Sequence, residues 1–112
     1  CRENGAELLL VELPTVTSWN AARHRGVAEF AAARELEFLD LNLLYDQMGL
    51  DGAVAFRDAG NHLNVIGATA VTAYLGRYIA RQYRLPDLRG NSRYANRQEE
   101  WVCYRRFVNG NV

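Results

Sequence analysis

The sequence predicts an α/β fold in which a parallel sheet is flanked by helices. Two short apolar runs, residues 7–13 and 37–41, have the composition of strands that are buried on both faces. Between them, residues 19–35 carry apolar side chains at spacings of three and four, which indicates a helix. A strand, a helix and a second strand in this order predict a parallel βαβ unit with a right-handed crossover.

The first strand is expected to stop at Pro14, and Thr17 and Ser18 are the candidate N-caps for the helix that follows. The second half of that helix is rich in alanine, which favours helix formation and close packing on a sheet. The second strand ends in an acid, Asp40, and Asn42 follows shortly after it. In parallel sheets ligand sites lie beyond the carboxyl ends of the strands, here residues 14–18 and 40–44.

The rest of the chain is predicted to be mainly helical. Residues 43–48 form a helical turn closed by Gly49, and residues 52–58 form a loop. Asn64 is expected to cap a long helix that ends before Pro86. Its apolar stripe is made of five residues: Val71, Tyr74, Leu75, Tyr78 and Ile79. A loop at 88–93 precedes a last helix at 94–108. We therefore predict an α/β part at residues 1–89 and a helical extension packing on it at 90–112.

Composition and charge limit the classes of function. The chain has 112 residues, 49% of them hydrophobic and 23% charged, which is ordinary for a globular domain. No apolar run reaches the roughly 18–20 residues of a membrane span. Residues 1–75 carry a net charge of −5 and residues 76–112 a net charge of +5. Solvated helix faces, or docking onto the acidic half, explain the basic half better than nucleic-acid binding does, so no nucleic-acid partner is expected.

Neither a metal nor a cofactor is expected. Cys1 and Cys103 lie at opposite ends of the sequence, so we expect two thiols, although a disulfide between them stays open. His24 has no companions at the spacing of metal ligands. The sequence opens on Cys1 without an initiator Met, and two strands make a thin sheet for this much apolar surface. We therefore expect residues upstream of Cys1, or a partner, to cover the sheet edge.

Polar side chains are concentrated in one loop just before the long helix: Asp58, Asn61, His62 and Asn64. Histidine is the commonest general base, and a carboxylate or carboxamide beside it can orient its ring. Under the alternative interpretation, the same groups only cap the helix N-terminus. This loop is expected to reach the edge of the sheet where the two strands end.

Three motifs in this order resemble the C-terminal part of bacterial SGNH/GDSL-type hydrolases and related O-acyltransferases. They are Phe38-Leu39-Asp40, His-Leu-Asn-x-x-Gly-Ala at 62–68, and Leu85-Pro86-Asp87. The resemblance covers residues 6–89 and implies a flavodoxin-like, three-layer parallel sheet with flanking helices, of which this chain holds the C-terminal portion. It also implies that His62 is the general base that takes the proton of a serine, and that Asp58 orients the imidazole.

The chain departs from the family pattern at two points. The family has Asp-x-x-His, whereas Asp58 stands four positions before His62, so Asn61 or a backbone carbonyl remains an alternative orienting group. The serine and oxyanion-hole motifs of the family are absent and are expected upstream of Cys1. Ser18 and Ser92 are the two serines present. Ser18 follows a strand and is a candidate nucleophile, but we expect it to act as a helix cap.

The expected function is that of a serine esterase or O-acyltransferase to which this chain supplies the His and Asp residues. The resemblance implies an acyl ester as substrate, on carbohydrates or cell-envelope polymers, and a location in the cell envelope or outside the cytoplasm. The competing hypothesis is a non-catalytic α/β module for binding or assembly. In that case the 58–64 loop is only a helix cap and the aromatic C-terminal helix is an interface.

Overall fold

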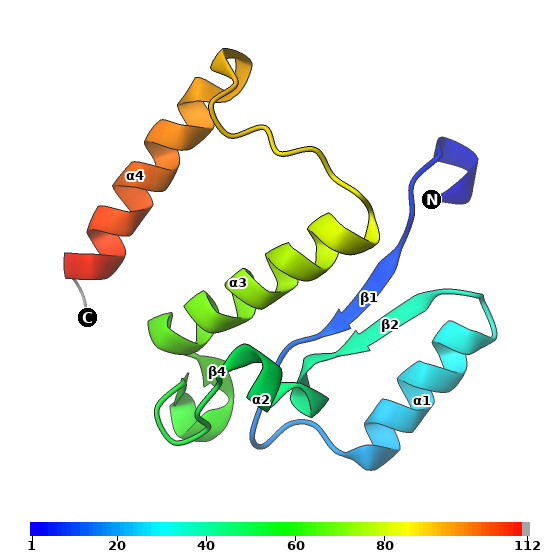
Figure 1. Ribbon diagram of the computed structural model, residues 1–112. Coiled ribbons are helices and arrows are strands. Elements are labelled where there is room, and N and C mark those ends of the chain that lie inside the picture. The colour runs from blue at the N-terminus through cyan, green and yellow to red at the C-terminus, as the bar shows by residue number, and fades with distance from the viewer. Residues whose placement is uncertain (111–112) are drawn as a thin grey trace. The chain divides into compact units, whose positions relative to one another are not determined.

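The computed structural model describes residues 1–110 as a mixture of helices and two small sheets (Figure 1). The chain divides into two compact units, Cys1–Val71 and Thr72–Val112. Each sheet has two strands, and both sheets lie in the first unit. The predicted α/β class is confirmed at this level.

A parallel βαβ unit opens the first unit, as predicted. Strand β1 (Leu9–Glu12) leads through helix α1 (Ala21–Ala32) to strand β2 (Glu37–Asp40). The strands pair in parallel with Leu9 opposite Glu37 and Glu12 opposite Asp40, and α1 packs against β2 (Figure 1). The prediction that the first strand is buried on both faces is wrong, because all four β1 residues are only half-buried.

The N-cap of α1 is Asn20, so the prediction of Thr17 or Ser18 at this position is wrong. The Asn20 side-chain oxygen accepts hydrogen bonds from the backbone N–H groups of Ala22 and Arg23, each at 3.0 Å. These groups are among the four that a helix N-terminus leaves without a partner in the helix. The hydroxyls of Thr17 and Ser18 are thereby left for contacts elsewhere in the first unit.

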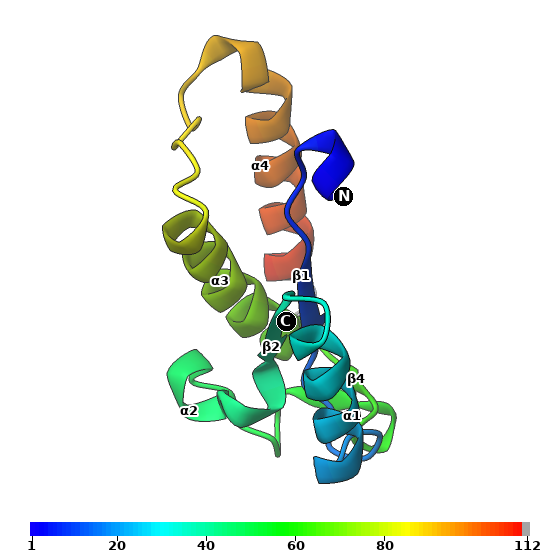
Figure 2. The same cartoon turned by 90° about the vertical axis from the view of Figure 1, so that its right-hand side faces the viewer.

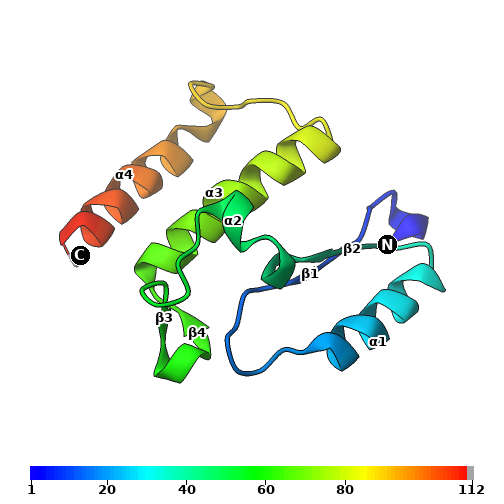
Figure 3. The same cartoon turned by 60° about the horizontal axis from the view of Figure 1, so that its bottom comes forward.

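Short segments follow β2. A 3-10 turn at Leu41–Leu43 leads into α2 (Tyr45–Met48), and Gly49 ends this helix in the left-handed conformation with φ of 62°. The predicted helical turn closed by Gly49 is therefore confirmed. A hairpin that the sequence did not predict comes next, made of β3 (Phe56–Arg57) and β4 (His62–Leu63). Figures 2 and 3 show this hairpin at the end of the sheet where β1 ends.

The buried apolar side chains of the described range all belong to the first unit: Pro14, Ala31, Leu39, Leu41, Met48, Leu50, Ala55 and Val71. Helix α3 (Val65–Gln82) begins in this unit, directly after β4. Gly67 in its first turns lies so close to Ala55 that a Cβ at Gly67 would collide with the Ala55 carbonyl oxygen. This close approach fixes the start of α3 against the chain that leads into the hairpin.

The second unit contains the rest of α3 and helix α4 (Ala95–Gly110), which follows a 3-10 turn at Ser92–Tyr94. Both long helices match the predicted ones. No residue of α4 is buried, and Trp101 and Tyr104 stack on it with ring centroids 5.9 Å apart. Among the described residues, no helix has the length and apolar character that a membrane span needs. Both cysteines are free and exposed.

Candidate active site

The β3–β4 hairpin brings His62 and Asp58 together. Asp58 starts the 3-10 turn that joins the two strands, and His62 is the first residue of β4. The His62 Nδ1 atom lies 3.0 Å from Asp58 Oδ2, within hydrogen-bond distance. The side chains are 64% and 59% exposed, and Arg57 Nε lies 3.8 Å from the same carboxylate oxygen. The extra residue in the Asp-to-His spacing therefore does not prevent contact.

The partner of Nδ1 determines what the other ring nitrogen can do. An ionised carboxylate only accepts hydrogen bonds, so Nδ1 carries the hydrogen and donates it to Asp58. In the neutral imidazole Nε2 then holds a lone pair. A histidine in this tautomer can take a proton at Nε2 while its other side is held by the carboxylate. This is the local geometry of a general base.

Backbone strain is concentrated in the turn between the two residues. Asp58, Ala59 and Gly60 have φ angles of 53°, 55° and 92°, in succession. Positive φ costs little for glycine but roughly 1–2 kcal/mol for a residue with a Cβ, although Asp tolerates it better than most. Such conformations persist where the surroundings hold them, and they are common at functional sites.

The loop after β1 holds this turn in place. The backbone N–H of Val16 donates to the Gly60 carbonyl at 2.9 Å, and the Thr15 hydroxyl donates to the same oxygen at 3.3 Å. The Thr17 hydroxyl donates to Asn61 Oδ1 at 3.0 Å. The prediction that the polar loop reaches the sheet edge at the end of the first strand is therefore confirmed.

Ser18 and Asn61 are partners of one another. The Ser18 hydroxyl donates to Asn61 Oδ1, its backbone N–H donates to the Thr15 hydroxyl, and its carbonyl accepts from the Arg23 guanidinium. The group that contacts the His62 ring is thus Asp58, while the Asn61 carboxamide binds the hydroxyls of the neighbouring loop. The Ser18 hydroxyl is directed to a carboxamide oxygen rather than to the imidazole.

Asn64 caps α3, as the sequence predicts. Its side-chain oxygen accepts from the backbone N–H groups of Ile66 at 2.9 Å and Gly67 at 3.1 Å. Its amide nitrogen donates to the Val54 carbonyl at 2.7 Å. Asn64 therefore ties the helix to the segment before the hairpin and fixes the strand that carries His62.

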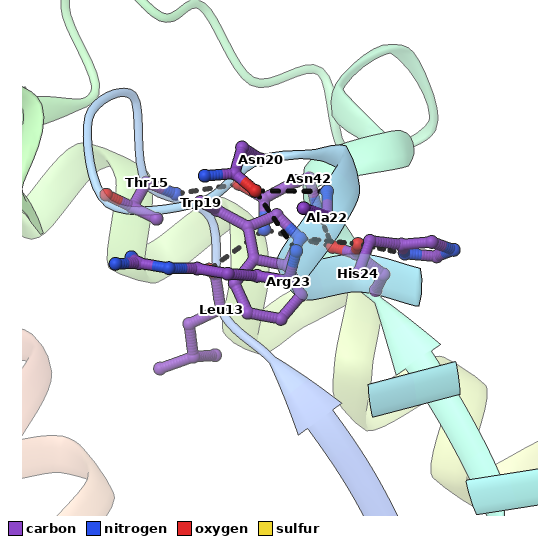
Figure 4. Close-up of polar contacts among 9 residues, drawn as sticks. Leu13, Thr15, Trp19, Asn20, Ala22, Arg23, His24 and Asn42 are labelled. Carbon is purple, nitrogen blue, oxygen red and sulfur yellow. Dashed lines mark hydrogen bonds and ion pairs between the residues drawn. The ribbon is translucent and has the colours of Figure 1, made fainter. Parts of the chain in front are cut away.

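A second polar cluster, not predicted from the sequence, surrounds Asp40 at the end of β2, and Figure 4 labels its partners Trp19, His24 and Asn42. Asp40 is buried, with 6% of its surface exposed. Its Oδ2 accepts from Trp19 Nε1 at 2.7 Å and lies 2.6 Å from His24 Nδ1, and its Oδ1 accepts from Asn42. Burial raises the pKa of Asp40, but the bonds from Asn42, His24 and Trp19 outweigh it, so the pKa lies below its ordinary value.

Glu12 faces this cluster from the neighbouring strand, directly opposite Asp40 in the sheet register. Burial and then the nearby Asp40 charge raise the pKa of Glu12, while Arg23 opposes the shift. The feature of the sequence that could have revealed this cluster is the acid at the end of the second strand, Asp40. Its partner His24 lies 16 residues earlier, on the helix, and only the βαβ crossover brings the two together.

Within residues 1–110, no group of three or more His, Cys, Asp or Glu side chains has the arrangement of a metal site. Comparison with known proteins yields no matching family model, curated protein or solved structure. The resemblance to SGNH/GDSL-type hydrolases therefore stays a prediction. The structural observations that bear on function are the contact between His62 and Asp58 and the hydrogen bonds from the loop after β1 to residues 60 and 61.

Proposed function

We propose that this chain supplies the base and its orienting carboxylate to an SGNH-like serine esterase or O-acyltransferase. The observation that carries the proposal is the 3.0 Å contact between His62 Nδ1 and Asp58 Oδ2. It leaves Nε2 as the proton-accepting atom, as a serine hydrolase requires. The parallel βαβ unit is compatible with the C-terminal portion of a flavodoxin-like sheet.

In the proposed reaction, His62 Nε2 takes the serine hydroxyl proton as the serine oxygen attacks the ester carbonyl. The imidazolium then gives this proton to the leaving alkoxide, and an acyl-enzyme remains. Water in a hydrolysis, or an acceptor hydroxyl in a transfer, then attacks the acyl group. His62 Nε2 takes the proton of the attacking hydroxyl and gives it to the serine oxygen as the bond between that oxygen and the acyl group breaks. Asp58 holds the tautomer and stabilises the imidazolium throughout.

The proposal places the serine and the oxyanion-hole donors in a segment outside these 112 residues. Ser18 is the alternative nucleophile from within the chain, but its hydroxyl is hydrogen-bonded to Asn61. Because the side chains of His62 and Asp58 are exposed, the proposal requires a further segment that covers them, since water weakens the electrostatics on which catalysis depends. By its resemblance the site would act on acyl esters of carbohydrates or envelope polymers, in the cell envelope.

The test is ester hydrolysis by a longer protein that contains this chain and the residues encoded upstream of it. With p-nitrophenyl acetate, His62→Ala is expected to lower kcat/KM by roughly 10²–10⁴-fold, the usual contribution of a general base. Asp58→Ala is expected to lower it by a smaller factor. The 112-residue chain alone is expected to show no turnover. Full activity of His62→Ala would contradict the proposal.

A binding or assembly module remains the second candidate, and the second unit favours it. Helix α4 exposes four large apolar side chains: Trp101, Val102, Tyr104 and Phe107. A groove of about 470 Å³ is lined by Leu88, Arg89, Tyr94, Arg97, Gln98 and Trp101. Exposed apolar patches of this kind often mark protein interfaces. If α4 pairs with a second copy, light scattering will show a dimer that Trp101→Ser with Phe107→Ser converts to a 12.7 kDa monomer.

A further inference from the structure

We propose that Asn42 is a positioning residue for His62, which it does not touch, and that it acts through the loop at residues 13–18. The proposal concerns the geometry of the hairpin. Its consequence for catalysis rests on the proposed function. The strained turn needs contacts from outside to keep its conformation, the 13–18 loop supplies them, and Asn42 fixes that loop.

The first step is the conformation of the turn. Asp58 and Ala59 both have positive φ although each has a Cβ. They are the first two residues of the turn that joins β3 to β4, the strand that begins with His62. A turn with this conformation relaxes unless contacts from outside hold it. Because Asp58 is itself the partner of His62 Nδ1, relaxation of the turn moves the carboxylate away from the ring.

The second step is the contact from the 13–18 loop. The Val16 N–H and the Thr15 hydroxyl both bind the Gly60 carbonyl, and Thr17 binds the side chain of Asn61. The Val16 side chain also packs against Gly60, where an added Cβ would lie 2.7 Å from Val16 Cβ. These contacts act on two successive residues of the turn, immediately before His62.

The third step is the anchoring of the loop by Asn42, at the end of the neighbouring strand. Asn42 Oδ1 accepts from the Thr15 backbone N–H at 2.9 Å. Its Nδ2 donates to the Leu13 carbonyl at 3.3 Å and to Asp40 Oδ1 at 2.9 Å (Figure 4). One carboxamide therefore binds the loop on both sides of Pro14.

The orientation of this carboxamide is determined by its partners. Asp40 accepts from the Asn42 side chain and backbone, and it is held in turn by Trp19 and by His24. Only a side chain with one donor and one acceptor at this length satisfies both Asp40 and the Thr15 N–H. An aspartate at position 42 would set a second carboxylate against Asp40, and an alanine would leave the Thr15 N–H without its side-chain partner.

The experiment records the ring ¹⁵N resonances of His62 and the backbone amide resonances of residues 58–61 in the 112-residue chain. Asn42→Ala and Asn42→Asp are expected to shift all of them and to move the His62 ring toward the Nε2–H tautomer. The control is Asn20→Ala, which removes a side-chain cap of the same chemical type from α1. It is expected to leave the His62 ring and residues 58–61 unchanged.

Thr15→Val is the milder variant if Asn42→Ala does not fold. It removes the hydroxyl that binds the Gly60 carbonyl but keeps the backbone N–H that binds Asn42. A smaller shift in the same direction is expected. The proposal is overturned if Asn42→Asp or Thr15→Val folds and the resonances of His62 and of residues 58–61 stay as in the parent chain.

Activity measurements separate this proposal from the proposed function. In the longer protein, Asn42→Ala is expected to lower kcat by about ten- to hundredfold with a smaller change in KM, because the base is misplaced rather than removed. If His62→Ala retains activity, the proposed function fails, while the resonance shifts still decide the positioning role. If His62→Ala is inactive and Asn42→Ala keeps its kcat, the catalytic consequence fails alone.

Discussion

The backbone N–H of Val16 donates to the carbonyl of Gly60 at 2.9 Å, and the Val16 side chain fills the space that a Cβ at Gly60 would need. This contact joins the loop after β1 to the turn that carries Asp58. It makes Gly60 essential for two reasons, its φ of 92° and its closeness to Val16.

Gly60→Ala is expected to lower the free energy of unfolding by about 1–3 kcal/mol, because it adds strain at positive φ to a collision with Val16. The measurement is urea unfolding followed by circular dichroism. The control is Gly49→Ala, at φ of 62°, where a Cβ would meet nothing within 4 Å. Equal losses in the two variants would show that the contact with Val16 contributes nothing.

Gly67 and Gly76 form a matched pair within α3. At Gly67 a Cβ would collide with the Ala55 carbonyl oxygen and lie 2.7 Å from Leu63 Cδ2, whereas at Gly76 it would meet nothing within 4 Å. Gly76→Ala is therefore expected to stabilise the chain by up to about 1 kcal/mol through helix propensity. Gly67→Ala is expected to destabilise it by about 1–3 kcal/mol through overpacking. Urea unfolding of both variants tests the prediction, and two changes of the same sign would contradict it.

The lowered pKa of Asp40 makes the free energy of unfolding depend on pH. Its pKa in the folded chain lies below its ordinary value of about 3.9, so its contribution is complete above that value. The contribution is lost as the pH falls through the lower, folded pKa. Asp40→Asn is expected to cost about 1–3 kcal/mol near neutral pH, because the carboxamide keeps only one acceptor oxygen and its NH2 group faces donors, either those of Trp19 and His24 or those of Asn42.

The check on this prediction is the free energy of unfolding of Asp40→Asn and the parent chain between pH 7 and pH 2. The difference between them is expected to shrink as the pH falls below about 4. A difference that stays constant over this range would show that ionised Asp40 does not stabilise the fold.

The ionised side chain of Glu12 is expected to lower the stability of the fold, whereas that of Asp40 raises it. Burial and the Asp40 charge raise its pKa, so the ionised side chain opposes folding at neutral pH. Glu12→Gln is expected to stabilise the chain near pH 7 by about 0.2–1 kcal/mol, the range for a cross-strand pair. The gain should shrink as the pH falls through the raised pKa of the folded chain and vanish below the ordinary pKa, where Glu12 is protonated in both the folded and the unfolded chain. A gain that persists at pH 3 would point to packing instead of charge.

The sequence predicted the parts of the fold that depend on local pattern. The apolar runs, the three-and-four spacing, Gly49 and the Asn64 cap all act within a few residues, and each gave the right element. The N-cap of α1 was wrong because three polar residues compete there. Asn20 is the one whose side chain accepts from α1, while the hydroxyls of Thr17 and Ser18 bind Asn61.

The sequence predicts which residues form the candidate site but not the backbone geometry that brings them together. The concentration of polar side chains in one loop and the family resemblance both point to Asp58 and His62, but the hairpin that joins them has strands of only two residues, too short for an alternating pattern. The positive φ angles of Asp58 and Ala59 have no sequence signal either, because the contact from Val16 to the next residue, Gly60, comes from a loop more than 40 residues earlier in the chain. The Asp40 cluster was missed because its members become neighbours only after the βαβ unit closes.

The most direct test of the account is covalent labelling with a fluorophosphonate, which reacts with a serine only when a base activates it. The longer protein that the proposed function requires is expected to gain one adduct, which peptide mass spectrometry locates on a serine outside these 112 residues. His62→Ala should slow the labelling by at least about a hundredfold, while the exposed helix variant Gly76→Ala labels at the parent rate. Equal labelling rates for His62→Ala and the parent would contradict the role of His62, and an adduct on Ser18 would contradict the placement of the nucleophile.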